Sequence, residues 1–300
     1  MGCWKAIYIE GYLDDLVGAG KSRPNRFTDM ECVIEDLGLI DYESAWKLQD
    51  TYAAEIAAGT RPPTLLLLEH PHVYTFGRRG QAENLLWNEN VLKEKGVATH
   101  WVDRGGDVTY HGPGQLVGYP LLQLEPIKPD RSHSESPGQE DSPVRPVRFE
   151  VDYIGYIRKL EQTLITALAN LGLVAGQRKG LTGVWVQADV WSRCSRCRPE
   201  DRQKPAKIAA IGVKVDARGV TRHGFALNVN PDMSYWDGII ACGLADEPVA
   251  SLADLLNPAP AMDRVKQEVI SAFGKVFGVE VSNPEERTGR SSTLITGKEE

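Results

Sequence analysis

Two residues far apart in the chain, Lys207 and Cys242, are of the types that nucleophilic catalysis uses. The segment KIAAIGVKVD begins with Lys207, and strict alternation along a strand places this lysine on the same face as Ile211 and Val213. A lysine on an apolar strand face either reaches solvent at the strand end or serves in proton transfer. Cys242 lies in the apolar segment GIIACGL, where a small buried hydrophobic residue is the simpler interpretation.

A lysine of this kind has a clear use beside a thiol. As an ammonium it stabilises the thiolate, and as a free amine it accepts the thiol proton. An isolated cysteine has a pKa of about 8.5 and is only a few per cent thiolate at neutral pH. Lowering that pKa by two units requires about 2.7 kcal/mol of differential interaction, which one close cation in a partly dry site can supply.

The segment RGGDVTYHGPGQLVGYP, residues 104–120, holds five glycines and two prolines but no lysine. Glycines at this density indicate that the backbone approaches a ligand closely or turns where a side chain would clash. A phosphate-binding loop would bring a lysine or arginine to the anion and lead into a helix. Here the basic residue is Arg104, and QLVGYPLLQL predicts a strand. We therefore expect a ligand other than phosphate.

Four further side chains are candidates with open alternatives. His111 and His223 each fit a base, a ligand-positioning donor or a structural histidine, and no carboxylate spacing around them indicates a metal site. Arg78 and Arg79, in EHPHVYTFGRRG, fit either an anion contact or a solvated turn.

The remaining cysteines do not form a recognisable site. Cys194 and Cys197 form a CxxC, but no second CxxC or HxxxH pair completes a zinc site, so we predict no metal. Cys3 and Cys32 have no supporting polar cluster around them. Five scattered cysteines are typical of a reducing compartment, which favours the cytoplasm.

Composition excludes several function classes. The 300 residues carry a net charge of −7 and are 42% hydrophobic, which is ordinary for a globular protein and gives no attraction to nucleic acid or anionic membranes. No apolar run approaches the length of a membrane span, and the N-terminus lacks an export signal. Ala6 stands where a myristoylation motif needs Ser or Thr.

Periodicity predicts the elements that must position these residues. Strands in hairpins mixed with separated helices favour an α+β fold with mixed sheets flanked by helices. We expect a tight turn at residues 217–218 between the strands 207–216 and 219–230. The other predicted strands are 64–70, 73–77, 118–124 and 183–188, and the predicted helices are 41–59, 151–173, 251–256 and 261–277.

The same pass along the chain predicts its organisation. Residues 1–40 form an N-terminal arm, 41–281 a single catalytic domain, and 282–300 a disordered tail. Two polar segments, at about 128–148 and 191–206, are predicted insertions within that domain because core elements flank each of them.

Several segments together resemble the lipoyl(octanoyl) transferase family, from about residue 41 to 278. They are RGGDVTYHGPGQLVGYP, EHPHVYTFGRRG, KIAAIGVKV, HGFALNVNPDMSYWDGIIACGL and EPVASL. The resemblance implies a fold related to the catalytic domain of biotin and lipoate protein ligases. It also implies an acyltransferase that moves an octanoyl group from acyl carrier protein to a lysine of a lipoyl domain, in lipoate biosynthesis and protein lipoylation.

The resemblance further implies the roles of particular residues. Cys242 is the thioester-forming nucleophile and Lys207 the acid/base lysine, with no cofactor and no metal. The acceptors are lipoyl domains of 2-oxoacid dehydrogenase E2 subunits and the glycine cleavage H protein. The implied acyl-binding residues are Arg104, Gly105, Gly106, Asp107, Val108, Thr109, Tyr110, His111, Ala210, Ile211, Gly212, Gly224, Phe225 and Ala226.

Two alternatives stay open. An ATP-dependent lipoate or biotin protein ligase on the same fold would use GRRG as its nucleotide loop and need no cysteine. A non-catalytic acyl-carrier-binding protein would bind both partners and transfer nothing. The insertion at 191–206 ends just before Lys207, and four of its residues could present a positive patch to acidic partners, although a solvated loop is the simpler interpretation. These are Arg193, Arg196, Arg198 and Arg202.

Overall fold

The computed structural model describes residues 31–127, 151–191, 203–241 and 247–282. Its strands, in chain order, are β1 (Glu31–Leu39), β2 (Thr64–Glu69), β3 (Val73–Phe76), β4 (Ala98–Trp101), β5 (Val108–His111), β6 (Gln115–Leu121), β7 (Gly176–Arg178), β8 (Leu181–Val186), β9 (Ala206–Val215), β10 (Thr221–Asn228) and β11 (Glu280–Ser282). Its α-helices are α2 (Tyr42–Ala57), α3 (Glu89–Glu94), α4 (Tyr153–Asn170), α5 (Ala188–Trp191), α6 (Leu252–Leu255) and α7 (Met262–Phe277).

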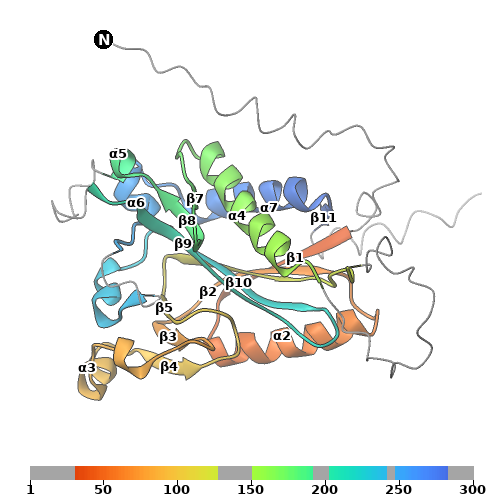
Figure 1. The fold of residues 1–300 in the computed structure, drawn as a ribbon, viewed down its shortest axis with the longest axis horizontal. Coiled ribbons are helices and arrows are strands. Elements are labelled where there is room, and N and C mark those ends of the chain that lie inside the picture. Colours follow the sequence, from red (N-terminus) through yellow and green to blue (C-terminus); the bar gives the residue numbers. More distant parts are fainter. Residues whose placement is uncertain (1–30, 128–150, 192–202, 242–246, 283–300) are drawn as a thin grey trace, which may run out of the picture.

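Two sheets organise these elements (Figure 1). The larger has eight strands in the order β11-β1-β2-β6-β10-β9-β8-β7, and the smaller has the order β4-β3-β5. The larger sheet is mixed, because β1 runs parallel to β2 and β11 whereas β2, β6, β10, β9 and β8 pair antiparallel in sequence. Helices α4 and α7 cover one face of this sheet and α2 covers the other (Figure 1). The expected α+β class is therefore confirmed.

Strand β2 shows why the sequence folds in this way. Its apolar run TLLLLE has no polar alternation, which is typical of a strand buried on both faces. Leu65 and Leu67 pack into the core beneath α4 and α7, whereas Leu66 and Leu68 pack into the core beneath α2. All four leucines are at most 1% exposed, so this strand forms the centre of the molecule.

The helix signals in the sequence also hold. The Asp41 carboxylate caps α2 by accepting a hydrogen bond from the Ser44 N–H at 2.9 Å. Ser251 and Asp254 form a reciprocal capping box at the start of α6. Helix α4 ends just before Gly172, whose φ of +86° is the left-handed conformation that glycine adopts at helix ends.

The N-terminal boundary differs from the expected one. Residues 31–39, which the sequence places in an arm, form β1 and pair with β2 and β11 inside the larger sheet. The sequence of β1 contains acidic residues and a glycine, which are uncommon in strands, and only Cys32, Val33 and Ile34 are buried. The insertion predicted at 128–148, most of the one at 191–206, and almost all of the predicted tail lie outside the described residues.

Strands β6 and β10 approach closely at two glycines. A Cβ atom on Gly224 would lie 2.1 Å from the Gly118 carbonyl oxygen and 2.8 Å from Cδ of Pro120. A Cβ atom on Gly118 would lie 2.1 Å from the Phe225 ring. Glycine at 118 leaves room for the Phe225 ring, and glycine at 224 lets the backbone of β10 approach that of β6.

We expect Gly224→Ala to lower the free energy of unfolding by about 3 kcal/mol, because its new methyl group meets rigid backbone rather than a flexible side chain. Urea denaturation measures the change. Gly176→Ala is the matched control: it also lies in a strand, but no atom lies within 4 Å of its Cβ position, so a change within about 0.5 kcal/mol is expected. Equal stability losses in the two variants would contradict the packing argument.

Candidate active site

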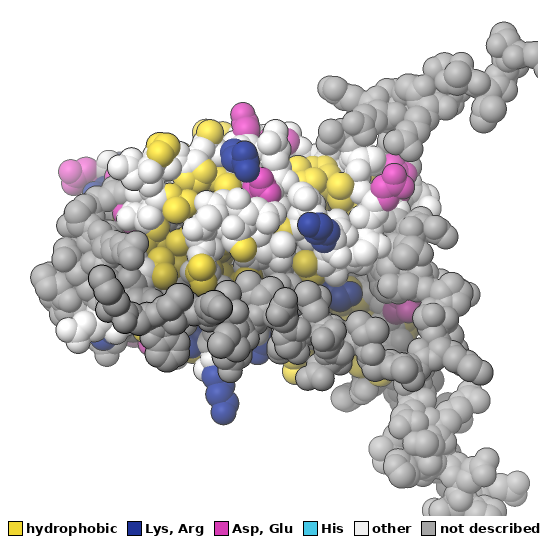
Figure 2. All heavy atoms as spheres, turned by 90° about the horizontal axis from the view of Figure 1, so that it is seen from above, with side chains coloured by type: hydrophobic (Ala, Val, Ile, Leu, Met, Phe, Trp, Pro, Cys, Tyr) yellow, Lys and Arg dark blue, Asp and Glu magenta, His cyan; other side chains and the backbone are white. Residues whose placement is uncertain are grey.

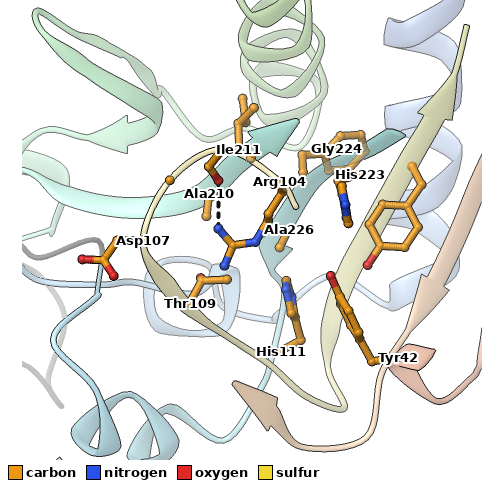
Figure 3. A pocket seen from close by; sticks show the side chains of 15 residues that line it. Tyr42, Arg104, Asp107, Thr109, His111, Ala210, Ile211, His223, Gly224 and Ala226 are labelled. Atoms are coloured by element: carbon orange, nitrogen blue, oxygen red, sulfur yellow. Dashed lines mark hydrogen bonds between the residues drawn. The ribbon is translucent and has the colours of Figure 1, made fainter. Parts of the chain in front are cut away.

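A cavity of about 50 Å³ lies between the loop before β5, the middle of β9 and the middle of β10 (Figure 3). The antiparallel pairing of β9 with β10 places Gly212 opposite Gly224 and Ala210 opposite Ala226. Segments far apart in the sequence therefore meet around one space. The residues implied as acyl-binding that line it are Arg104, Gly105, Gly106, Asp107, Thr109, His111, Ala210, Ile211, Gly212, Gly224, Phe225 and Ala226.

The other two implied acyl-binding residues, Val108 and Tyr110, do not line the cavity. They alternate along β5 with Thr109 and His111, so their side chains project to the opposite face. There both pack into the apolar cluster of the smaller sheet. The Tyr110 hydroxyl also forms a 2.9 Å hydrogen bond with Nδ1 of His72. These two residues therefore hold β5 in place behind the cavity.

The side chain of Arg104 lies across the middle of the cavity (Figure 3). Its Nη2 donates to the Thr75 carbonyl and hydroxyl oxygens at 2.5 and 2.8 Å, and its Nη1 donates to the Gly105 carbonyl at 2.9 Å. Glycines make room for it: a Cβ on Gly77 would lie 2.7 Å from Nη1, and one on Gly212 would lie 3.1 Å from Cδ. Arg104 thus ties the loop to β3.

The glycine-rich loop and the GRRG loop are joined through their backbones. Successive N–H groups of residues 77–79 donate to the carbonyls of Asp107, Arg104 and Gly106 at 3.3, 3.0 and 3.0 Å. The Asp107 carboxylate also accepts a 2.6 Å hydrogen bond from Nδ2 of Asn84. The two loops therefore form one double-layered wall.

Neutral histidines stand near the cavity. The ring of His111 is buried and its Nδ1 forms a 2.8 Å hydrogen bond with Oε1 of Gln115. Burial holds the pKa of His111 well below its usual range and lowers the pKa of His70 to about 4. His70 bridges the Ile40 carbonyl and the Tyr119 hydroxyl, at 2.8 Å each. Both imidazoles are therefore polar but uncharged at neutral pH.

Sequence reasoning missed two residues that line the cavity, Tyr42 and Tyr119, and left the role of a third, His223, open. Tyr42 begins α2 and Tyr119 lies in β6, so both look like ordinary core residues in the sequence. His223 adopts a φ of +56°, which is unusual for a residue other than glycine, and the sequence around it does not predict this conformation.

Behind His223 lies an ionic cluster centred on Asp103. Its carboxylate accepts hydrogen bonds from Nε2 of His223 at 2.8 Å, from Nη2 of Arg222 at 2.6 Å, and from the Lys214 ammonium. Burial acts to raise the pKa of Asp103, but the hydrogen bonds of His223 and Lys214 and the charge of Arg222 hold it well below its usual range.

Because the pKa of Asp103 is lower in the folded than in the unfolded chain, its contribution to stability is present above about pH 4 and is lost as the pH falls below that value. We expect Asp103→Asn to lower the free energy of unfolding at pH 7 by about 1–2 kcal/mol. The difference from wild type should shrink between pH 5 and pH 3 in urea denaturation. Asp36→Asn, at the surface pair with Lys266, is the control with a smaller effect. A pH-independent difference for Asp103→Asn would contradict the linkage.

Lys207 lies at the adjoining groove, a hollow of about 720 Å³. Gly105, Gly106, Ile211 and Gly212 line both the groove and the cavity, so the two spaces are continuous along the loop and β9. Arg78, Arg79 and Tyr153 also line the groove. This places two basic side chains of the GRRG loop on the same hollow as Lys207.

The Lys207 side chain does not extend into solvent, since it is 8% exposed and its ammonium lies 4.9 Å from the centre of the Trp185 ring. The alternation expected along β9 is interrupted here: β8 pairs Val184 with Ala209 but Trp185 with Lys207, so Ile208 is the extra residue of a bulge. The backbone N–H of Lys207 donates to the Pro248 carbonyl at 2.8 Å.

The other residues of the predicted chemistry lie outside the described part of the chain. These are Cys242, the Cys194–Cys197 pair, and the four arginines of the second insertion. Among the residues that the structure describes, no His, Cys, Asp or Glu cluster could hold a metal ion, and none of the helices has the length and apolar character of a membrane span.

Figure 2 shows hydrophobic side chains interspersed with a few charged ones on the face seen from above.

The chain belongs to the lipoyl protein ligase A/B catalytic domain family, whose sequence profile matches residues 41–137 and 142–274. The resemblance noted in the sequence is thereby confirmed. Among its relatives, the octanoyltransferase of Chloroflexus aurantiacus is 42% identical over 244 residues, covering 81% of this chain and 93% of the relative. The octanoyltransferase of Cytophaga hutchinsonii is 37% identical over 269 residues, covering 85% and 96%.

Solved structures share the fold. A bipartite lipoate protein ligase from Thermoplasma acidophilum superposes with a TM-score of 0.59 at 16% identity, covering 88% of this chain and 91% of that chain. A lipoate-protein ligase A bound with ATP superposes with a TM-score of 0.55 at 15% identity, covering 88% and 93%. At these identities the likeness is one of fold, and it confirms the expected relation to the lipoate ligase catalytic domain.

Proposed function

We propose that this protein transfers an octanoyl group from octanoyl-acyl carrier protein to a lysine of a lipoyl domain, through a thioester on Cys242. The observation that supports it best is the meeting of three separate segments, 104–111, 210–212 and 224–226, around one cavity that continues into the groove of Lys207. Relatives named octanoyltransferase at up to 42% identity support the same assignment.

The proposed reaction has two steps. The Cys242 thiolate attacks the carbonyl carbon of the carrier thioester after its proton passes to Lys207, and the pantetheine thiol leaves with a proton returned by Lys207. The lysine of the lipoyl domain then gives a proton to Lys207 and attacks the enzyme thioester, which forms the amide and releases the cysteine. Splitting the transfer between two thiol leaving groups is nucleophilic catalysis in its ping-pong form.

The described residues supply the surroundings that such a reaction needs. The side chains of Ala210, Ile211, Phe225 and Ala226 give the cavity apolar walls suited to an alkyl chain. Burying six methylene groups along this cavity and the adjoining groove contributes about 5 kcal/mol to binding. The Gly105 N–H already donates to the Val213 carbonyl, so it is not a donor for the oxyanion.

The groove also suits the proposed partners. Arg78 and Arg79 carry positive charge on the same hollow as Lys207. Carrier proteins and lipoyl domains, including those of 2-oxoacid dehydrogenase E2 subunits and the glycine cleavage H protein, are usually small acidic domains. A basic groove edge therefore favours their approach in spite of the net charge of −7.

The test is the mass of the protein after incubation with octanoyl-acyl carrier protein in the absence of nucleotide. Gain of one octanoyl group, mapped to Cys242 by peptide analysis and lost on adding a lipoyl domain, is the expected result. An ATP-dependent ligase would instead load free octanoate only with nucleotide and acquire no stable adduct. A carrier-binding protein without activity would bind octanoyl-acyl carrier protein and remain at its original mass.

A further inference from the structure

The end of the cavity away from the groove is polar. Tyr42, Tyr119 and His223 line the cavity but not the groove, whereas the residues shared by the two spaces are glycines, Asp107 and Ile211. In Figure 3 the Tyr42 hydroxyl, the His223 ring and the His111 ring gather on one side of the Arg104 guanidinium. An acyl tail that enters from the groove thus passes the shared residues and the Arg104 side chain before it reaches Tyr42, Tyr119 and His223.

Two of these groups lack partners among the described residues. His223 is 1% exposed, and its buried Nδ1 has no hydrogen bond. Tyr42 is 4% exposed and lines the cavity; its hydroxyl has no hydrogen bond among the described residues and is not one of their fully buried unpaired atoms. By contrast, the Tyr119 hydroxyl is paired with His70 and Nδ1 of His111 is paired with Gln115. Buried polar groups without partners are rare and require an explanation.

The state of His223 is fixed by its other contacts. Its Nε2 faces the Asp103 carboxylate at 2.8 Å, so Nε2 carries the proton and Nδ1 presents a lone pair. Its backbone holds a φ of +56°, with the N–H donating to Oε1 of Gln49 at 2.7 Å. A strained backbone that is held in place by several contacts is a common feature of functional sites. In Figure 3 the His223 ring lies beside the Tyr42 hydroxyl at the cavity.

We propose that the Tyr42 hydroxyl and Nδ1 of His223 form a polar stop at the end of the acyl cavity, which sets the longest alkyl chain that the enzyme accepts. The inference rests on the proposed function, since it assigns the acyl tail to this cavity. A tail that ends before the stop leaves the Tyr42 hydroxyl accessible to water. A longer tail displaces that water and leaves the hydroxyl unpaired beside the Nδ1 of His223, which is already buried without a partner, and this is unfavourable.

The same stop accepts a longer chain if its tip is polar. Nonanoyl and 8-hydroxyoctanoyl chains have the same number of non-hydrogen atoms, but only the second ends in a hydroxyl that can form a hydrogen bond with the Tyr42 hydroxyl. Comparing these two acyl chains therefore distinguishes an effect of the polarity of the stop from an effect of the length of the cavity.

The experiment compares kcat/KM for octanoyl-, nonanoyl- and 8-hydroxyoctanoyl-acyl carrier protein in the wild type and in Tyr42→Phe. We expect the wild type to prefer 8-hydroxyoctanoyl over nonanoyl by about tenfold. Tyr42→Phe keeps the ring and removes only the hydroxyl, so it should reduce that preference and raise the ratio of nonanoyl to octanoyl. Tyr156→Phe, which removes a core hydroxyl that contacts the Pro120 carbonyl at 3.4 Å, should leave all the ratios unchanged.

Equal use of nonanoyl and 8-hydroxyoctanoyl chains by the wild type, or a ratio that Tyr42→Phe does not move, would overturn the proposal. If no acyl chain is transferred at all, the proposed function fails rather than the stop. Calorimetric binding of free nonanoic and 8-hydroxyoctanoic acids then still tests the stop, with preference for the hydroxy acid expected in wild type and lost in Tyr42→Phe. The absence of that preference in binding would equally overturn it.

Discussion

Replacing Cys242 with serine is expected to abolish formation of the octanoyl-enzyme and to lower the rate of octanoyl transfer by at least about 10³-fold. A serine hydroxyl stays protonated under conditions in which a lysine-assisted thiol ionises, so the carrier thioester meets no anionic nucleophile. The measurements are the mass of the protein after mixing with octanoyl-acyl carrier protein and the rate at which a lipoyl domain gains octanoyl.

The matched control is Cys32→Ala. Cys32 is fully buried in β1, and burial raises the pKa of its thiol to about 12, so it has no nucleophilic role. This variant should form the octanoyl-enzyme as the wild type does. Loading of Cys242→Ser to the wild-type extent, or loss of loading in Cys32→Ala with the fold intact, would count against Cys242 as the nucleophile.

The second large effect is expected at Lys207. Lys207→Met keeps an unbranched aliphatic side chain beside Trp185 but removes the ammonium that lies over its ring. Loss of a positioned acid/base group typically costs about 10²–10⁴-fold in rate, and we expect a loss in that range at pH 7.

The pH dependence distinguishes an acid/base role from a packing role. Without the lysine, the thiol has to ionise on its own, so the transfer rate of Lys207→Met should rise about tenfold per pH unit and level off above about pH 8.5. The wild type should reach its plateau at lower pH, because the lysine favours the thiolate. Lys214→Met is the control on the same strand: it removes an ion pair with Asp103 and should keep the wild-type pH profile. A flat profile for Lys207→Met would contradict the acid/base role.

Much of the architecture could be predicted from the sequence because it depends on local patterns. The hairpin of β9 and β10, the cap of α2 at Asp41 and the doubly buried β2 all follow from turn residues, capping residues and apolar periodicity. Strand β1 could not be predicted because its parallel pairing with β2 and β11 joins segments far apart in the chain, and its sequence has no regular alternation of apolar and polar residues.

The site shows the same division. The glycines around residue 105 and those at 212 and 224 could be found in the sequence, because close backbone approach leaves a compositional signal. Tyr42 and Tyr119 could not, because a tyrosine at the core face of a helix or strand looks the same whether it faces a core or a cavity. The bulge at Ile208 depends on the register of β8 against β9, which no single segment encodes.

The backbone hydrogen bonds between residues 77–79 and the carbonyls of 104–107 have a consequence for how this surface can diversify. Those bonds use main-chain atoms alone, so the spacing of the two loops does not depend on which residue types occupy positions 78 and 79. The charge at positions 78 and 79 can therefore vary during evolution while the spacing of the two loops stays constant. If the groove receives the proposed partner proteins, partner choice and substrate fit can change separately.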